Sequence, residues 1–184
     1  MNINNKSGLV DDAQQIASAN CDARPDAQNI SLIVIHNISL PPGEFGGPYI
    51  SQLFTNQLDP NAHPYFADIH QLKVSSHLLI RRTGEIIQYV PLHKRAWHAG
   101  ASSYCGVENC NDFSIGIELE GTDNTPFEAI QYITLANCIL NLQQNYPSLA
   151  KDAITGHSNI APGRKTDPGP AFNWDHLQQL LTQN

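Results

Sequence analysis

The chain has 184 residues, of which 10 are Lys or Arg and 17 are Asp or Glu, so its formal net charge is -7 with neutral histidines. This length fits one domain with a real core, and 41% hydrophobic residues is an ordinary globular composition. The acidic balance argues against a protein that grips nucleic-acid phosphates, which requires clustered basic side chains. Histidine is the unusual residue, because its eight copies nearly equal all lysines and arginines together.

The N-terminal residues, the apolar runs and the cysteines bear on the cellular compartment of the protein. The first residues contain no apolar stretch as long as that of a signal peptide, and no run approaches the roughly 20 apolar residues of a membrane span. We therefore expect a cytoplasmic protein without membrane contact, and nothing in the sequence demands more than a monomer. The four cysteines contain no CxxC pair. We expect unpaired structural thiols, although their even number formally allows a disulfide.

The N-terminal third of the chain predicts one strand and one helix. Residues 1–23 are polar and are expected to form a lead-in to a single domain over residues 24–184. The β-branched apolar run at 31–36 predicts a buried strand that ends in a histidine. A loop rich in Gly and Pro follows at 41–48, and apolar residues at helical spacing over 49–58 predict a helix.

The middle of the chain predicts a hairpin, a strand and a helix. Residues 74–90 have the pattern of a hairpin, and residues 113–119 alternate strictly between an apolar face and a face of Ser, Gly and Glu. The next segment begins like a helix, with Thr125 as N-cap and Pro126 at the first helical position. Glu128, three residues after the cap, would complete a capping box.

The last third predicts a short strand and a closing helix. Pro147 forbids continuation of the preceding helix, and residues 152–155 form a short strand that leads to Gly156-His157. A Pro- and Gly-rich loop covers 161–170, and an amphipathic helix covers 174–181. Strands and helices are interleaved, so we expect one α+β (mixed α/β) domain whose central mixed sheet is flanked by helices.

Three side chains lie where a scaffold would present them for chemistry. His36 ends a buried strand, His157 follows a short strand, and Asp167 lies in a loop confined by prolines and glycines. Two imidazoles and one carboxylate with an open fourth position are typical of a catalytic zinc site. The same residues also fit a histidine at the edge of a core and an aspartate that caps a turn, and the pattern alone leaves both interpretations open.

Three further residues are candidates for the same site. Glu118 lies on the small, polar face of its strand, where a carboxylate near zinc can move a proton, although a solvent-facing edge strand would also explain it. Lys165 lies two residues before Asp167 and can stabilise an oxyanion, or it is an ordinary solvated lysine. Trp97, within 96–100, suits a wall that stacks on a sugar or a peptide, and a core tryptophan is the alternative.

Several segments of the chain, in the right order, resemble the AmpD-type N-acetylmuramoyl-L-alanine amidases of the peptidoglycan-recognition-protein family. The resemblance covers roughly residues 24 to 182, and it rests on the order of the motifs rather than on any one of them. The matching segments are 33–45, 74–77, 82–90, 96–100, 110–121, and 156–157 with 163–169.

The resemblance implies a fold and a reaction. It implies a peptidoglycan-recognition-protein-like fold and a zinc amidase that cuts the amide between N-acetylmuramic acid and L-alanine. The implied substrate is the 1,6-anhydro-muropeptide that returns to the cytoplasm during cell-wall recycling, and loss of the activity is implied to raise β-lactamase induction. By position, the resemblance assigns Zn2+ to His36, His157 and Asp167, acid/base catalysis to Glu118, transition-state stabilisation to Lys165, and substrate binding to Asn37, Lys73 and Trp97.

Two positions depart from the family pattern. Lys73 stands where many relatives carry arginine, so a bidentate contact to a carboxylate becomes a point-charge contact. Asn109 stands before Cys110 where relatives often have a basic residue, which puts one contact to an anion in doubt. Neither departure touches the expected zinc ligands or Glu118.

Three other functions compete with the enzyme. A non-catalytic peptidoglycan-binding module on the same fold should have lost a ligand or the acid, whereas this chain keeps all of these positions. A secreted wall-lytic amidase predicts a signal or a lipoprotein cysteine near the start, and neither is visible. An unrelated interaction domain would bind no zinc. The sequence therefore favours the amidase.

Overall fold

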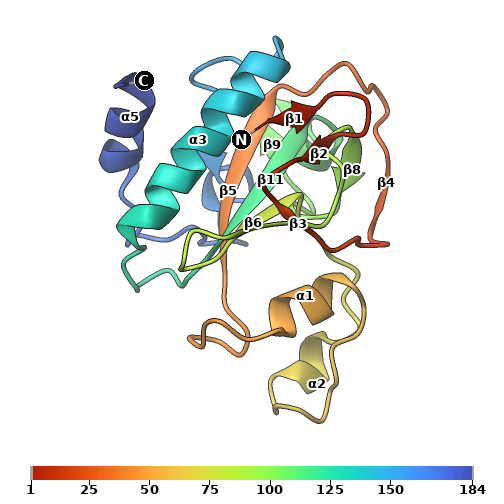
Figure 1. Cartoon of the computed structure of the whole chain (residues 1–184). Coiled ribbons are helices and arrows are strands. Elements are labelled where there is room, and N and C mark those ends of the chain that lie inside the picture. Colours follow the sequence, from red (N-terminus) through yellow and green to blue (C-terminus); the bar gives the residue numbers. More distant parts are fainter. Residues whose placement is uncertain (1, 184) are drawn as a thin grey trace.

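A mixed six-stranded sheet forms the centre of the computed structural model, which describes residues 2–183. Four neighbouring strands are parallel, the fifth is antiparallel to the fourth, and the sixth is parallel to the fifth. Helices cover the sheet, as Figure 1 shows, so the predicted α+β architecture is confirmed. In spatial order the strands are β12 (Ile154–Gly156), β5 (Leu32–Ile38), β11 (Ser114–Glu120), β6 (Leu78–Ile80), β7 (Ile86–Gln88) and β3 (Gln14–Gln15).

The two long strands, β5 and β11, are buried on both faces. Strands in this position must be apolar on both sides, which explains the continuous apolar run in β5. Ile33 and Ile115 pack in the larger core under helix α3, whereas Leu32 and Val34 pack on the opposite face. Because β11 lies between β5 and β6, the alternative of a solvent-facing edge strand is wrong.

Helices α3 (Ala129–Asn145) and α5 (Trp174–Thr182) cover one face of the sheet and lie beside each other (Figure 1). Helix α3 ends before Pro147, as predicted, but it begins after Glu128 rather than after Thr125. Thr125 instead forms a turn in which its N–H donates to Thr122 Oγ1 at 3.1 Å. The Gln131 side chain accepts from the Glu128 N–H at 3.0 Å, so the cap is built from Glu128 and Gln131.

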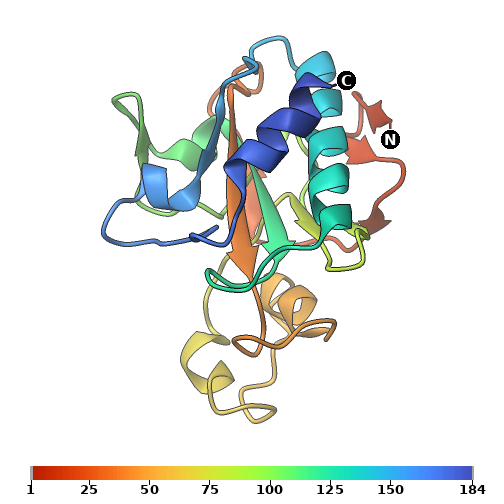
Figure 2. The same cartoon turned by 90° about the vertical axis from the view of Figure 1, so that its left-hand side faces the viewer.

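A small lobe stands beyond the carboxyl ends of β5 and β11, as Figure 2 shows. It contains α1 (Tyr49–Phe54), which the sequence predicts as a longer helix, and the four-residue α2 (Phe66–Ile69), which it does not predict. Phe54 and Phe66 anchor the lobe in a second apolar cluster. The lobe therefore faces the sheet edge at which the parallel strands end.

Residues 2–23 are more ordered than the expected lead-in. Strand β3 extends the central sheet, and β4 (Cys21–Ala23) pairs with β8 (Lys94–Ala96). The division of the chain at residue 23 stays a prediction, but the residues before it pack on the domain that follows. The remaining elements are β1 (Ile3–Asn4), β2 (Leu9–Val10), β9 (Ser103–Tyr104), β10 (Val107–Glu108), a 3-10 helix (Cys110–Asp112) and α4 (His157–Ile160).

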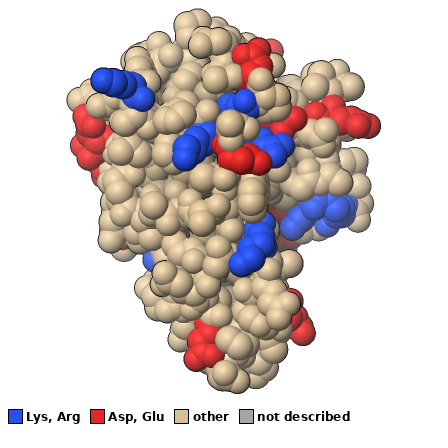
Figure 3. All heavy atoms as spheres, turned by 90° about the vertical axis from the view of Figure 1, so that its right-hand side faces the viewer, with Lys and Arg blue, Asp and Glu red and all other residues tan. Residues whose placement is uncertain are grey.

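The surface mixes charges of both signs. Figure 3 shows a face on which Lys and Arg side chains lie beside Asp and Glu. Arg95, for example, makes ion pairs of 2.6 Å with both Asp22 and Asp112. None of the four cysteines, which all lie within residues 2–183, forms a disulfide, and Cys110 and Cys138 are buried. Within residues 2–183, no helix has the length and apolar character needed to cross a membrane.

The loop at 161–170 is fixed by contacts with the turn that follows β11. Ala171 N–H donates to Asp123 O at 2.9 Å, and the Asp167 carbonyl accepts from Ser158 N–H at 2.9 Å. Gly169 has a φ of +81°, and a Cβ at this position would collide with the backbone of Asp123. The absence of a side chain at Gly169 therefore lets the loop approach closely and hold Asp167 in place.

We expect Gly169→Ala to destabilise the protein more than Gly43→Ala. Both glycines have similar positive φ, +81° and +84°, but a Cβ at Gly43 would have nothing within 4 Å. Gly43→Ala should cost about 1–2 kcal/mol from the left-handed backbone alone, and Gly169→Ala should add about 1–3 kcal/mol of steric strain. Urea unfolding measures both free energies, and equal losses would contradict the close approach.

Candidate functional site

The register of the parallel strands brings three functional candidates to one edge of the sheet. Glu118 of β11 is paired directly with His36 of β5, and Gly156 of β12 is paired with Ile35. His157 follows Gly156 and begins α4, so it lies beside His36. His36 and His157, 121 positions apart in the chain, thus become neighbours because parallel strands end at the same edge of the sheet.

Three ligand atoms converge at this edge. The Nδ1 atoms of His36 and His157 are 2.9 Å apart, and each lies 3.0 Å from Asp167 Oδ2. Both histidines are at least 97% buried. Among the described residues, these three form a group that could hold a metal ion. A tetrahedral zinc ion keeps nitrogen and oxygen ligands about 3.3 Å from one another, so the donor set and spacing fit such an ion.

The opposite ring nitrogens of the two histidines are also hydrogen-bonded. His157 Nε2 lies 3.1 Å from the Ala99 carbonyl oxygen, and His36 Nε2 lies 2.9 Å from His98 Nδ1. A carbonyl oxygen can only accept, so His157 carries a proton on Nε2, and the neutral form of the ring turns an unprotonated Nδ1 toward Asp167. This is the arrangement in which an imidazole presents a lone pair to a cation.

The electrostatics of the group suit a cation. Burial lowers the pKa of His36 to about 4, although Asp167 opposes this effect, so the imidazole is neutral near pH 7. Burial alone would raise the pKa of Asp167, but its contacts with His157 and His36 outweigh that effect and hold the pKa well below its ordinary value. The neutral imidazole of His36 and the ionised carboxylate of Asp167 therefore suit the binding of a cation.

Glu118 has the environment of a proton-transfer group. It is 8% exposed, and its Oε2 has no hydrogen-bond partner among residues 2–183. Burial, and then the charge of Asp167, raise the pKa of Glu118 well above its ordinary value, whereas Lys165 lowers it. Such a carboxyl group holds a proton more readily than an ordinary glutamate, which suits a group that transfers protons.

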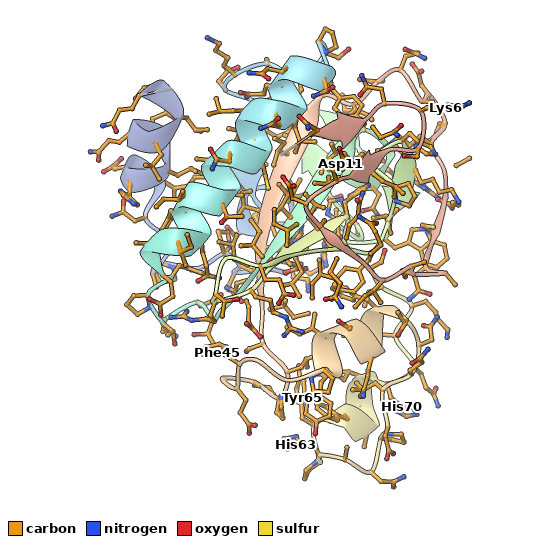
Figure 4. All side chains as sticks on the ribbon, in the orientation of Figure 1. Lys6, Asp11, Phe45, His63, Tyr65 and His70 are labelled. Atoms are coloured by element: carbon orange, nitrogen blue, oxygen red, sulfur yellow. The ribbon has the colours of Figure 1, made fainter. Side chains whose placement is uncertain are left out.

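A cleft of about 370 Å³ lies between the metal-binding group and the small lobe. Figure 4 shows Tyr65 on this lobe, and Tyr65 lines the cleft together with Leu72. Lys73 does not line it, although Leu72 and Val74 on either side do, so its contact with substrate stays a prediction. The other predicted site residues that line the cleft are His36, Asn37, Trp97, Glu118, His157, Lys165 and Asp167.

The structure adds residues that the sequence did not single out. His98 contacts His36, and the Ala99 carbonyl contacts His157, so the segment next to Trp97 supports both imidazoles. The small residues next to His98 in the sequence, Ala99 and Gly100, could have indicated that its ring is closely packed. A Cβ at Gly116 would lie only 2.5 Å from His98 Cγ, so the ring packs directly on the glycine of β11.

Known proteins resemble the chain over almost its whole length. The family model of N-acetylmuramoyl-L-alanine amidase matches residues 26–170. A Citrobacter freundii protein named 1,6-anhydro-N-acetylmuramyl-L-alanine amidase AmpD is 60% identical over 95% of this chain and 93% of its own length. The Escherichia coli protein of the same name is 56% identical over 97% of both chains.

Solved structures agree with these sequence matches. The crystal structure of a selenomethionine AmpD derivative has a TM-score of 0.94 and 58% identity, and the match covers 98% of this chain and 99% of that one. The E. coli amidase AmiD, solved with anhydro-N-acetylmuramic acid-L-Ala-D-γ-Glu-L-Lys as substrate, has a TM-score of 0.61 and 30% identity. That match covers 86% of this chain and 60% of AmiD.

We expect Arg164→Ala to loosen the support of the Ala99 carbonyl. Arg164 NH2 donates to Ala99 O at 2.5 Å and to Ala101 O at 2.7 Å, which ties the loop of Asp167 to this segment. Loss of both bonds should lower the free energy of unfolding by about 1–2 kcal/mol, since a charged donor at a partly exposed site contributes modestly. Lys151→Ala, which also removes one exposed cation, is the control. Equal stability of the two variants in urea unfolding would show that this tie is unimportant.

Proposed function

Because the chain belongs to the N-acetylmuramoyl-L-alanine amidase family, we propose that it is a zinc-dependent amidase that acts on 1,6-anhydro-N-acetylmuramoyl-L-alanine in muropeptides. The amidase family was expected from the sequence and is confirmed, and the chain is an amidase of this type. The zinc ion, the anhydro sugar and the roles of individual residues are the parts that we propose.

The convergence of two histidine Nδ1 atoms and one carboxylate oxygen is the observation that supports the zinc site most directly. His36, His157 and Asp167 would hold the ion and leave a fourth position toward the cleft. Bound there, zinc would lower the pKa of a water molecule and polarise the carbonyl group of the substrate.

Two residues of this chain would move the proton and stabilise charge. Glu118 takes a proton from the attacking water and returns it to the nitrogen of the departing L-alanine, because its raised pKa suits both transfers. Lys165 lines the same cleft, and its ammonium group stabilises the negative charge that develops on the carbonyl oxygen. Asn37 and Trp97 line the cleft and would position the sugar and the peptide.

The names of the relatives support the proposed substrate. Both AmpD proteins are named as 1,6-anhydro-N-acetylmuramyl-L-alanine amidases, and the solved AmiD contains an anhydro-muramyl peptide. We propose accordingly that the chain acts in the cytoplasm as a monomer, in cell-wall recycling, and that its loss raises β-lactamase induction indirectly. The alternative that the sequence left open, a peptidoglycan-binding module without catalysis, is disfavoured, because the chain is an amidase and the candidate acid and ligands are all present.

Incubation of the pure protein with anhydro-muropeptide and with intact sacculi, with and without a chelator, tests the proposed function. We expect mass spectrometry to show L-Ala-containing peptide and free anhydro-N-acetylmuramic acid from the soluble substrate, and full loss of release after the chelator. Readdition of one equivalent of Zn2+ should restore it. Release that persists in the metal-free protein would contradict zinc dependence, and release from sacculi alone would contradict the proposed substrate.

Glu118→Gln should retain zinc but lose turnover. The substitution keeps the size of the side chain and removes the group that accepts the proton, so we expect kcat to fall by about 10²–10⁴-fold. The exposed Glu108→Gln is the matched control and should keep the activity of the unaltered protein. Zinc content by atomic absorption and kcat from released peptide decide the matter. A Glu118→Gln variant that turns over normally would remove Glu118 from the proposed mechanism.

A further inference from the structure

A chain of hydrogen bonds connects the imidazole of His36 to the backbone carbonyl of Cys110, shortly before the start of β11. His36 Nε2 lies 2.9 Å from His98 Nδ1, and His98 Nε2 lies 3.2 Å from Ser114 Oγ. The Ser114 hydroxyl donates to the Cys110 carbonyl oxygen at 2.5 Å. His36, Ser114 and Cys110 are buried, so protein groups determine the direction of each bond.

The carbonyl at the end of the chain fixes where each proton lies. Cys110 O has no proton, so the Ser114 hydroxyl gives its proton to this carbonyl and offers a lone pair to His98 Nε2. His98 must then carry its proton on Nε2 and accept at Nδ1. His36 therefore carries its proton on Nε2, and its Nδ1 faces His157 and Asp167 with a free lone pair.

Both the backbone and the ring of His98 are held in place by neighbouring segments. The backbone N–H groups of His98 and Ala99 both donate to Asn111 Oδ1, at 3.1 and 2.8 Å. On the other side the His98 ring packs against Gly116, where a Cβ would lie 2.5 Å from its Cγ. Ser114, Gly116 and Glu118 share one face of β11, so the same face supports His98 and carries the candidate acid.

We propose that His98 is a positioning residue that, together with Ser114, holds His36 in the tautomer whose Nδ1 can bind a cation. Hydrogen bonds of this kind to the second nitrogen of a ligating histidine commonly change metal affinity by about 10–100-fold when removed. The inference rests on the proposed metal site, because it assigns to His98 a role in preparing one of that site's ligands.

The test compares His98→Leu with His98→Asn, two side chains of similar size. Asn can still offer an oxygen near the position of His98 Nδ1, whereas Leu offers none. We expect His98→Leu to bind Zn2+ about 10–100-fold more weakly in competition with a chromogenic chelator, and His98→Asn to recover most of that loss. Ser114→Ala, which leaves His98 in place, should weaken binding by a smaller factor in the same direction.

A spectroscopic readout separates positioning from general damage. Long-range 1H–15N spectra of the metal-free protein at pH 8 report the tautomer of His36. We expect the Nε2–H form in the unaltered protein and in His98→Asn, and a mixture of tautomers in His98→Leu. A His98→Leu variant that keeps the Nε2–H form and the zinc affinity of the unaltered protein would overturn the role of His98 alone. An unaltered protein that binds no zinc would overturn the proposed metal site, and this inference with it.

Discussion

The parallel pairing of β5 with β11 and β12 is the constraint on which the site depends. It places His36 opposite Glu118. It also pairs Gly156 with Ile35, so that His157, the next residue, lies beside His36. A shift of either register by one residue would turn these side chains to the other face of the sheet, under helix α3. The apolar residues of β5 and β11 prevent such a shift because both faces are buried. The core therefore specifies the geometry of the chemistry.

Hydrogen bonds from segments outside these strands orient the two imidazoles that the strand register brings together. In the neutral rings, the Ala99 carbonyl and the chain from His98 to the Cys110 carbonyl favour the tautomer whose Nδ1 is unprotonated and faces Asp167. Three lone pairs within 3.0 Å of one another repel unless a cation lies among them. The net charge of -7 argues against a surface that grips nucleic-acid phosphates, but it says little about this site, where a bound cation and Lys165 would reverse the local sign.

Sequence reasoning succeeded where local pattern and burial agree. The apolar run of β5, the alternation of β11 and the stop before Pro147 each follow from residues that are adjacent in the chain. The start of α3 was misplaced because Thr125 has the composition of an N-cap, yet its N–H bonds to Thr122 Oγ1 and leaves Glu128 to begin the helix. The two- and three-residue strands before residue 24 have too few residues to show a period. Strands β3 and β4 form through pairing with distant strands, and β1 and β2 pair with each other.

The candidate site was predictable to different degrees for different residues. His36, His157 and Asp167 stand at strand ends and in a confined loop, and the resemblance to the family placed them in one site. The small residues beside His98 were its one local signal, but its role could not be predicted, because its partners His36 and Ser114 lie 62 and 16 residues away and neither contact leaves a local pattern. The contact of Lys73 with substrate stays a prediction from the resemblance to the family, since the residues beside Lys73 line the cleft and Lys73 does not.

The zinc X-ray absorption spectrum of the protein loaded with one equivalent of metal tests the central claim most directly. If the strand register, the Ala99 carbonyl and His98 prepare the site as described, the first shell contains nitrogen and oxygen ligands, with outer-shell scattering from two imidazoles. Scattering from three imidazoles would place His98 on the metal and contradict the account. A shell without imidazole, or one that contains sulfur from a cysteine, would contradict it as well.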